Sequence, residues 1–170
     1  MCSSDLEARE ILGMEIEQFK VDLDELQSVT LEGVFEPKAR QAYELAGEPV
    51  LVEDTGLFID GLGDLPGALI KWFEGSVGLD GILAMVSADA PRTARAETIV
   101  GYWDGEKIIS GKGIINGSIS LEQRGDNGFG WDTIFIPDGH DRTFAEMTAE
   151  EKNSMSMRSL ALTELGNNMA

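Results

Sequence analysis

The chain has 170 residues, 42% of them hydrophobic and 26% charged, which suits one globular domain with its own core. Its net charge of −18, from 31 acidic and 13 basic residues, disfavours binding to duplex DNA or long RNA, because neutralising phosphates requires lysine and arginine. This negative charge still allows one small phosphorylated ligand to bind, provided that a metal and a few nearby basic residues offset it. The sequence shows neither a bilayer-length apolar run nor a secretory signal, and its single Cys2 favours a reducing compartment, so we expect a cytoplasmic protein without membrane partners.

The first half of the chain mixes helix-like and strand-like patterns. We interpret residues 1–6 as a non-native leader and residues 7–170 as a single domain. The apolar spacing predicts a helix over 6–12 closed by Gly13, a strand around 16–21, and a helix over 36–46 with Gly47 just past its end. Two short strands follow, one over 50–52 and one ending at Ile59.

The second half continues this mixture. Two helices over 69–77 and 79–86 are separated at Gly78, and strands over 95–103 and 107–120 form a hairpin around Asp104 and Gly105. A glycine-rich loop over 125–130 leads into a short strand over 131–136, and one long helix over 148–165 ends the fold. Intermixed helices and strands predict an α/β fold with one sheet flanked by helices.

The stretch from 49 to 73 is the strongest candidate for a site. Its first strand ends in two adjacent carboxylates, Glu53 and Asp54. Carboxylates at the end of a buried strand occupy the usual ligand position of an open α/β sheet, and two adjacent anions need a cation, a proton or water. Oxygen ligands suit Mg²⁺. The alternative is a strand end whose two acids are simply hydrated.

Other segments carry groups that a nucleoside phosphate needs, namely charge for the phosphates and a ring for stacking. These groups are Glu25, Lys38, Lys71, the segment Phe129–Gly130–Trp131–Asp132, and Lys152, Ser156 and Arg158. The alternatives are that the two aromatic side chains belong to the core and that Lys152 and Arg158 lie on a solvated helix face. A single histidine, His140 in a turn, disfavours zinc sites and Ser-His-Asp chemistry.

Three long segments, VLVEDTGLFIDGLGDLPGALIKWF, FGWDTIFIPDGHDRTFAEM and EKNSMSMRSLAL, together resemble the inosine triphosphate pyrophosphatase family, and two further segments lean toward its archaeal members. The resemblance implies Mg²⁺-dependent hydrolysis of non-standard purine nucleoside triphosphates (ITP, XTP and dITP) to the monophosphate and pyrophosphate, with Mn²⁺ able to replace Mg²⁺. It also implies a homodimer, and an elongated single domain with a twisted mixed sheet and an active-site cleft between two lobes.

The resemblance implies roles by position. Asp54 matches the catalytic carboxylate that works at the metal and activates water, with Glu25 as an acidic metal ligand and Glu53 as a supporting metal group. Lys38 and Lys71 match phosphate-binding lysines. The base-binding residues are Phe129, Gly130, Trp131, Asp132, Lys152, Ser156, Met157 and Arg158.

Two departures from the family pattern affect these expectations. The family's first strand and its phosphate-binding loop are missing, so we expect an N-terminally truncated domain whose exposed sheet edge favours aggregation. The family motif Ser-His-Arg becomes Ser156-Met157-Arg158, and methionine cannot donate a hydrogen bond to a keto oxygen. We therefore predict weaker discrimination of ITP over ATP than in a histidine-bearing homologue.

Three rival functions remain open at this stage. The first is a related pyrophosphatase acting on modified pyrimidine or 7-methylguanine nucleotides, which the FGWD and KNxxSxR segments disfavour. The second is a catalytically impaired nucleotide-binding remnant without the phosphate loop. The third is an acidic cation-binding module, although DGLGD lacks the alternating oxygen ligands of an EF-hand loop.

Overall fold

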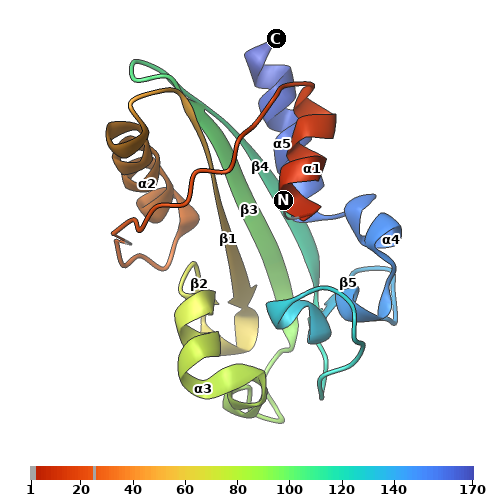
Figure 1. Cartoon of the computed structure of the whole chain (residues 1–170). Coiled ribbons are helices and arrows are strands. Elements are labelled where there is room, and N and C mark those ends of the chain that lie inside the picture. The colour runs from red at the N-terminus through yellow and green to blue at the C-terminus, as the bar shows by residue number, and fades with distance from the viewer. Residues whose placement is uncertain (1–2, 25) are drawn as a thin grey trace.

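The computed structural model describes residues 3–24 and 26–170, with the side chains described from residue 8 onward. Its helices are α1 (Ser3–Leu12), α2 (Leu31–Ala46), α3 (Ile70–Met85), α4 (Ala149–Asn153) and α5 (Met157–Met169). Its strands are β1 (Val50–Ile59), β2 (Pro66–Gly67), β3 (Thr93–Trp103), β4 (Ile108–Ile119) and β5 (Phe135–Pro137). The α/β class and the sheet flanked by helices are thereby confirmed (Figure 1).

The described strands form one open sheet in the order β2-β1-β3-β4-β5. Every pairing among them is antiparallel, so the expectation of a mixed sheet is wrong for the described residues. The predicted β3–β4 hairpin is confirmed, and strands joined by so tight a turn must run antiparallel. Asp104 shapes this turn, since its Oδ1 accepts hydrogen bonds from the backbone N–H groups of Glu106 and Lys107.

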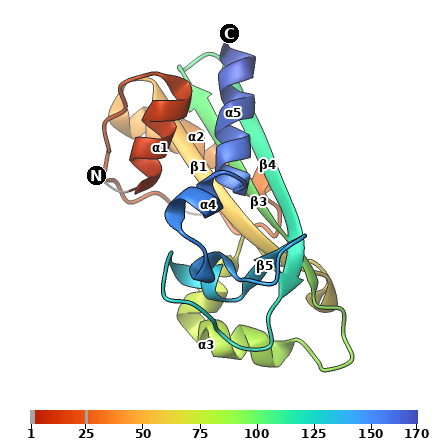
Figure 2. The same cartoon turned by 90° about the vertical axis from the view of Figure 1, so that its right-hand side faces the viewer.

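Helices α2 and α5 cover opposite faces of the sheet. Ile99 and Val100 are neighbours on β3, so their side chains point to opposite faces. Ile99 packs in one core cluster with Phe35 of α2, whereas Val100 packs in another with Leu162 of α5. Figure 1 shows α2 on one side of the long strands and α5 with α1 on the other, and Figure 2 shows α5 running along β3 and β4. We call these two surfaces the α2 face and the α5 face.

Strand β1 runs without interruption through the two carboxylates. Its pairing with β3 holds one register from Val50 opposite Trp103 to Ile59 opposite Ala94. The expectation of two short strands with a strand end at Glu53 and Asp54 is therefore wrong. β1 pairs with β3 along its whole length. This pairing keeps β1 extended even at its middle residues, which include a glycine and have low strand propensity.

The other helix predictions were right in kind and less accurate at the ends. Helix α2 begins five residues earlier than expected, because the Thr30 side chain accepts a hydrogen bond from the N–H of Gly33 and caps it there. The kink at Gly78 inside α3 and the end of α1 at Gly13 are confirmed. The predicted strand around 16–21 is wrong, since residues 15–24 have no regular structure.

The predicted long helix over 148–165 is two helices. Ser156 breaks it, because its side chain accepts a hydrogen bond from the N–H of Ser159 and caps a new helix, α5. The strand expected over 131–136 is shorter. Residues 131–133 belong to a 3₁₀ helix (Gly130–Thr133) that Ile134 ends, and β5 begins only at Phe135. No helix within residues 3–24 and 26–170 is long and apolar enough to cross a membrane.

Helix α5 lies directly on the backbone of β4. A Cβ atom added at Gly113 would lie 1.8 Å from the carbonyl oxygen of Met157, and one added at Gly111 would lie 2.1 Å from that of Ala161. Any side chain at these two positions would push the helix away. The start of α5, and with it Arg158, is thus held close to the sheet.

Candidate active site

Asp54 projects from β1 to the α2 face, where it meets a lysine of α2. The ammonium of Lys38 lies 3.8 Å from Asp54 Oδ1 and donates a 2.7 Å hydrogen bond to the backbone carbonyl of Glu53. The same Asp54 oxygen accepts a hydrogen bond from the N–H of Thr55. Both side chains are largely buried, at 19% exposed for Asp54 and 24% for Lys38. The catalytic and phosphate-binding residues expected here therefore do lie together.

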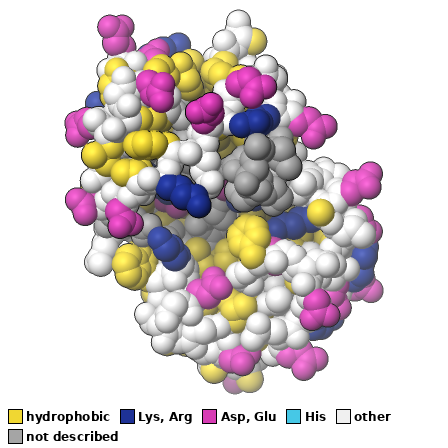
Figure 3. Space-filling view, viewed as in Figure 1, with side chains coloured by type: hydrophobic (Ala, Val, Ile, Leu, Met, Phe, Trp, Pro, Cys, Tyr) yellow, Lys and Arg dark blue, Asp and Glu magenta, His cyan; other side chains and the backbone are white. Residues whose placement is uncertain are grey.

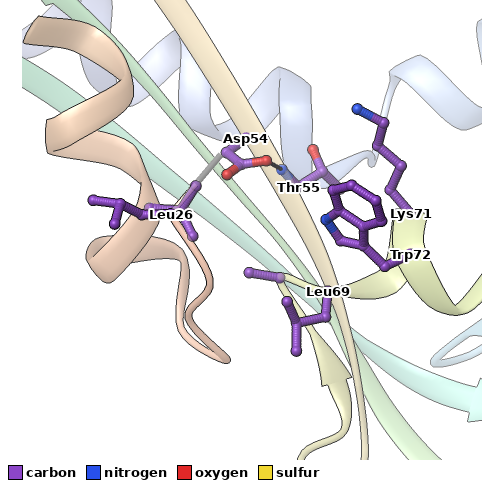
Figure 4. Close-up of a pocket in the computed structure, with 8 residues that line it drawn as sticks. Leu26, Asp54, Thr55, Leu69, Lys71 and Trp72 are labelled. Atoms are coloured by element: carbon purple, nitrogen blue, oxygen red, sulfur yellow. Dashed lines mark hydrogen bonds between the residues drawn. The ribbon is translucent and has the colours of Figure 1, made fainter. Parts of the chain in front are cut away.

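A pocket connects Asp54 with the start of α3 (Figure 4). Lys71 and Trp72 extend from the first turn of that helix and line the pocket together with Asp54. Trp72 is 53% exposed, an unusual position for so large an apolar side chain. Trp72 is absent from the residues expected at the site, although its place directly after Lys71 at a helix start is a signal for it.

Glu53 points to the opposite, α5 face, because successive side chains of a strand alternate. There the Nε of Arg158 donates hydrogen bonds of 2.9 and 3.0 Å to both carboxylate oxygens, and Nη2 donates one of 2.6 Å to Oε1. The two neighbouring acids thus do not form one cluster, since each faces its own cation. A metal role for Glu53 stays a prediction.

Asp132 and Lys152 form a second, more deeply buried ion pair. Lys152 Nζ lies 2.6 Å from Asp132 Oδ2, and the two side chains are 12% and 3% exposed. The same carboxylate oxygen accepts the backbone N–H of Phe129, and the Lys152 ammonium lies 5.1 Å from the centre of the Phe129 ring. The Phe129 ring itself is 65% exposed. These three residues, expected to bind a base, are brought together with an open aromatic surface.

Four further residues expected at the base have other contacts in the structure. Trp131 is buried in the main core, where its ring packs edge-on against Phe135. Met157 is 4% exposed and belongs to the same core cluster. Ser156 is buried as the cap of α5, and Gly130 adopts a left-handed conformation with φ of 55° at the start of its turn. Trp131 lies in the core, as the alternative expected, and the base-binding roles of all four residues stay predictions.

The Asp54–Lys38 and Glu53–Arg158 pairs meet at an edge of the sheet, the outer side of β1. Strand β2 pairs with β1 only at Leu57 and Phe58, so within the described residues no strand pairs with the outer side of β1 along 50–55. A cleft of about 740 Å³ follows this edge, and Lys38 and Glu53 both line it. Figure 3, viewed as in Figure 1, shows lysine and arginine side chains around a hollow in the middle of the molecule. A ligand at the edge could contact both faces of the sheet at once.

A preformed metal site is absent among the residues that the structure describes, since no three His, Cys, Asp or Glu side chains there gather around one point. Glu25 lies outside the described residues, so its predicted role as a ligand has no structural counterpart here. Asp54 fits Mg²⁺, which commonly binds one or two carboxylates together with substrate phosphates and water. Glu53 lies on the other face and is bonded to Arg158, and its predicted metal role stays a prediction.

The helix that carries Lys152 is held by a charged cap. Glu151 of α4 accepts hydrogen bonds from Arg142 and from the backbone N–H of Thr148. The bond from Arg142, followed by that from Thr148, lowers the pKa of Glu151 from its ordinary 4.5 to about 2. This cap fixes the start of α4 and hence the position of Lys152.

The sequence is matched from residue 5 to residue 168 by the model of the Ham1 family. The chain belongs to the Ham1 family. The dITP/XTP pyrophosphatase of Thermococcus kodakarensis is 43% identical over 159 residues, which are 93% of this chain and 85% of that protein. The inosine triphosphate pyrophosphatase of Schizosaccharomyces pombe is 45% identical over 163 residues, covering 94% of this chain and 86% of that protein. The family assignment made from the sequence motifs is confirmed, and archaeal proteins are among the relatives.

Solved structures of the Ham1 family share the fold. A HAM1 protein from Coxiella burnetii superposes with a TM-score of 0.84 at 29% identity, covering 99% of this chain and 94% of that one. The Ham1 protein of Staphylococcus aureus gives a TM-score of 0.76 at 25% identity, covering 88% and 80%. The overall fold is therefore one that this chain shares with solved Ham1 proteins.

Proposed function

We propose that this Ham1 protein hydrolyses non-standard purine nucleoside triphosphates (ITP, XTP and dITP) to the monophosphate and pyrophosphate in a Mg²⁺-dependent reaction. The observation that carries the proposal is the placement of two charged pairs on the two sides of β1, Asp54 with Lys38 and Glu53 with Arg158. Asp54, Lys38 and Lys71 lie by the α2 face and the start of α3, and Phe129, Lys152 and Arg158 lie toward the α5 face. The names of relatives more than 40% identical over most of the chain support the same reaction.

The α2-face group suits phosphate chemistry. A carboxylate beside two lysines can orient a water molecule for attack on the α-phosphorus, and the lysines can stabilise the charge that develops on the departing pyrophosphate. In this reaction Asp54 accepts the proton of the attacking water. Lys38 limits the electrostatic repulsion between Asp54 and the phosphates. Mg²⁺, held by Asp54 and phosphate oxygens, would supply further neutralisation of the phosphate charge.

The α5-face group suits a purine base. The exposed ring of Phe129 offers a stacking surface, and Lys152 and Arg158 offer donors to a 6-keto oxygen. Adenine has an amino group at that position and would leave these donors unpaired, which is costly in a partly buried site. Discrimination of ITP and XTP from ATP follows from this difference.

The direct test is incubation of the full chain with ITP, XTP, dITP, dATP and ATP in the presence of Mg²⁺, with pyrophosphate and orthophosphate measured separately. We expect pyrophosphate and monophosphate from the first three substrates. Orthophosphate in place of pyrophosphate would contradict the proposal. Nucleotide binding without turnover would support the impaired remnant instead.

Two further parts of the proposal concern the setting of the reaction. We propose a homodimer, which light scattering after size-exclusion chromatography tests directly. We also propose that the enzyme acts in the cytoplasm, where nucleoside triphosphates are consumed by polymerases and where a chain with one cysteine needs no disulfide. Such an activity would remove non-standard nucleotides from the cellular nucleoside triphosphate pool.

A further inference from the structure

Arg158 occupies a position that helix stability alone does not favour. It lies in the first turn of α5, two residues after the cap Ser156. The N-terminus of a helix carries partial positive charge, so a guanidinium there is repelled by the helix dipole. A compensating anion is therefore needed to keep this side chain in place, and Glu53 supplies it from β1, 105 residues away in the sequence.

The contact between the two side chains fixes an orientation as well as a charge. Glu53 receives the Nε–H group through both of its oxygens and an Nη2–H group through one of them, which sets the plane of the guanidinium. The pair is partly withdrawn from water, since Arg158 is 16% exposed and Glu53 30%. The backbone of Met157, the residue before Arg158, lies directly on Gly113 of β4, so the backbone of Arg158 is held close to the sheet.

The second cation of this face is held in the same way. Lys152 is bound by Asp132, which is also fixed by the N–H of Phe129. Each cation of the expected base site thus has its own acid, Asp132 for Lys152 and Glu53 for Arg158. Asp54 faces the other side of β1 and is balanced by Lys38.

We propose that Glu53 is a positioning residue that determines base specificity by orienting Arg158, and that it does not act at the metal. This inference rests on the proposed function. It predicts that two carboxylates adjacent in sequence affect different kinetic constants. Loss of Glu53 should raise KM for ITP and reduce discrimination against ATP, whereas loss of Asp54 should lower kcat.

The experiment compares Glu53→Gln, Arg158→Lys and the double variant with the wild type, measuring kcat and KM for ITP and for ATP and the Mg²⁺ concentration that gives half-maximal rate. For Glu53→Gln we expect KM for ITP to rise at least about tenfold, since a charge-assisted pair is lost. The expected change in kcat is within about threefold, and that in the Mg²⁺ requirement within about twofold. The effects of the two single variants should be strongly non-additive in the double variant.

Glu44→Gln is the matched control, because Glu44 is an exposed acid of α2. If Glu53→Gln does not fold, as judged by urea unfolding, Glu53→Asp keeps the charge but withdraws it by one carbon, and the same split between KM and kcat is expected in milder form. A raised Mg²⁺ requirement with lowered kcat would overturn the inference in favour of a metal role. Additive effects, or unchanged KM and selectivity, would overturn it as well.

The wild-type protein separates this inference from the proposal on which it rests. Absence of pyrophosphate from ITP with the wild type means that the proposed function fails, and the inference fails with it. Pyrophosphate release by the wild type together with unaltered kinetics in Glu53→Gln refutes the positioning role alone.

Discussion

The two faces of β1 place neighbouring carboxylates in different surroundings. On the α2 face, Asp54 has an ammonium 3.8 Å away and lines an open pocket. On the α5 face, Glu53 accepts hydrogen bonds of 2.9, 3.0 and 2.6 Å from one guanidinium. A carboxylate that lines an open pocket can meet water or a metal there, whereas a carboxylate held in a bidentate pair serves to orient that partner. Two consecutive residues of one strand can therefore have separate roles, Asp54 in the reaction and Glu53 in base recognition.

The largest effect should follow from removing Asp54, the acid that lines the open pocket. Asp54→Asn keeps the size of the side chain but removes its charge and its basicity, so we expect kcat for ITP to fall by about 10²–10⁴-fold. Steady-state kinetics at saturating Mg²⁺ measure this change. Asp89→Asn, at an exposed turn after α3, is the matched control and should leave kcat unchanged. Near-normal turnover by Asp54→Asn would remove the basis for assigning chemistry to the α2 face.

Lys71 tests whether charge on the pocket wall contributes to the same step. Replacing it in Lys71→Met keeps most of the apolar stem while removing the ammonium, and we expect kcat to fall by about 10²-fold because developing charge on the pyrophosphate loses a partner. Lys107→Met, in the exposed β3–β4 turn, controls for the loss of one positive charge. Equal effects in the two variants would show that only net charge matters.

Asp132 should matter for stability because it is the most buried acid of the α5-face group. Asp132→Ala leaves the Lys152 ammonium without this partner in a site that is largely closed to water, and we expect the free energy of unfolding to fall by about 3 kcal/mol. Urea denaturation followed by tryptophan fluorescence measures it. Asp138→Ala, at an exposed turn, is the comparison. An equally stable Asp132→Ala variant would argue against a rigid base site.

Met157→His tests the departure from the family motif. Because Met157 is almost fully buried, we expect a loss of about 1–2 kcal/mol in stability from placing an imidazole there. We also expect the ratio of kcat/KM for ITP to that for ATP to rise. Leu160→His, on the exposed side of α5, provides a control for the added histidine. Unchanged selectivity would mean that residue 157 does not take part in base recognition.

The smallest effect concerns the cap of α4. The pKa of Glu151 is lowered to about 2 by Arg142 and Thr148, below its ordinary 4.5, so the cap stabilises the fold fully above about pH 4.5 and loses that contribution as the pH falls toward 2. NMR titration of the Glu151 carboxyl should give a midpoint near 2. In Glu151→Gln, unfolding should depend less steeply on pH between 5 and 2. A midpoint near 4.5 would show that the cap is open in solution.

Local signals in the sequence predicted those parts of the structure that depend on neighbouring residues. Gly13 and Gly47 mark helix ends, and Asp104 with Gly105 marks the hairpin, because a left-handed backbone or a side-chain turn is encoded at one position. The continuity of β1 could not be predicted in this way. It depends on pairing with β3 over its whole length, through residues with weak strand propensity.

The site was predictable as a set of residues but not as an arrangement. Resemblance to the family selected Asp54, Lys38 and Arg158 before any geometry was known. That Glu53 pairs with Arg158 follows only from β1 and α5 packing together across 105 residues. Whether Trp131 or Phe129 would be exposed was equally undetermined, because either aromatic ring could have filled the core next to Phe135.

The glycines beneath α5 have a consequence for how the specificity of this protein can change. Main chain rests on main chain where Gly113 meets Met157, so no rotamer there can shift to absorb a substitution nearby. The backbone contact therefore fixes where Arg158 begins, whatever side chain stands at position 158. In directed evolution, position 158 is then the target for new base preferences, provided that the buried Met157 and both glycines are left untouched.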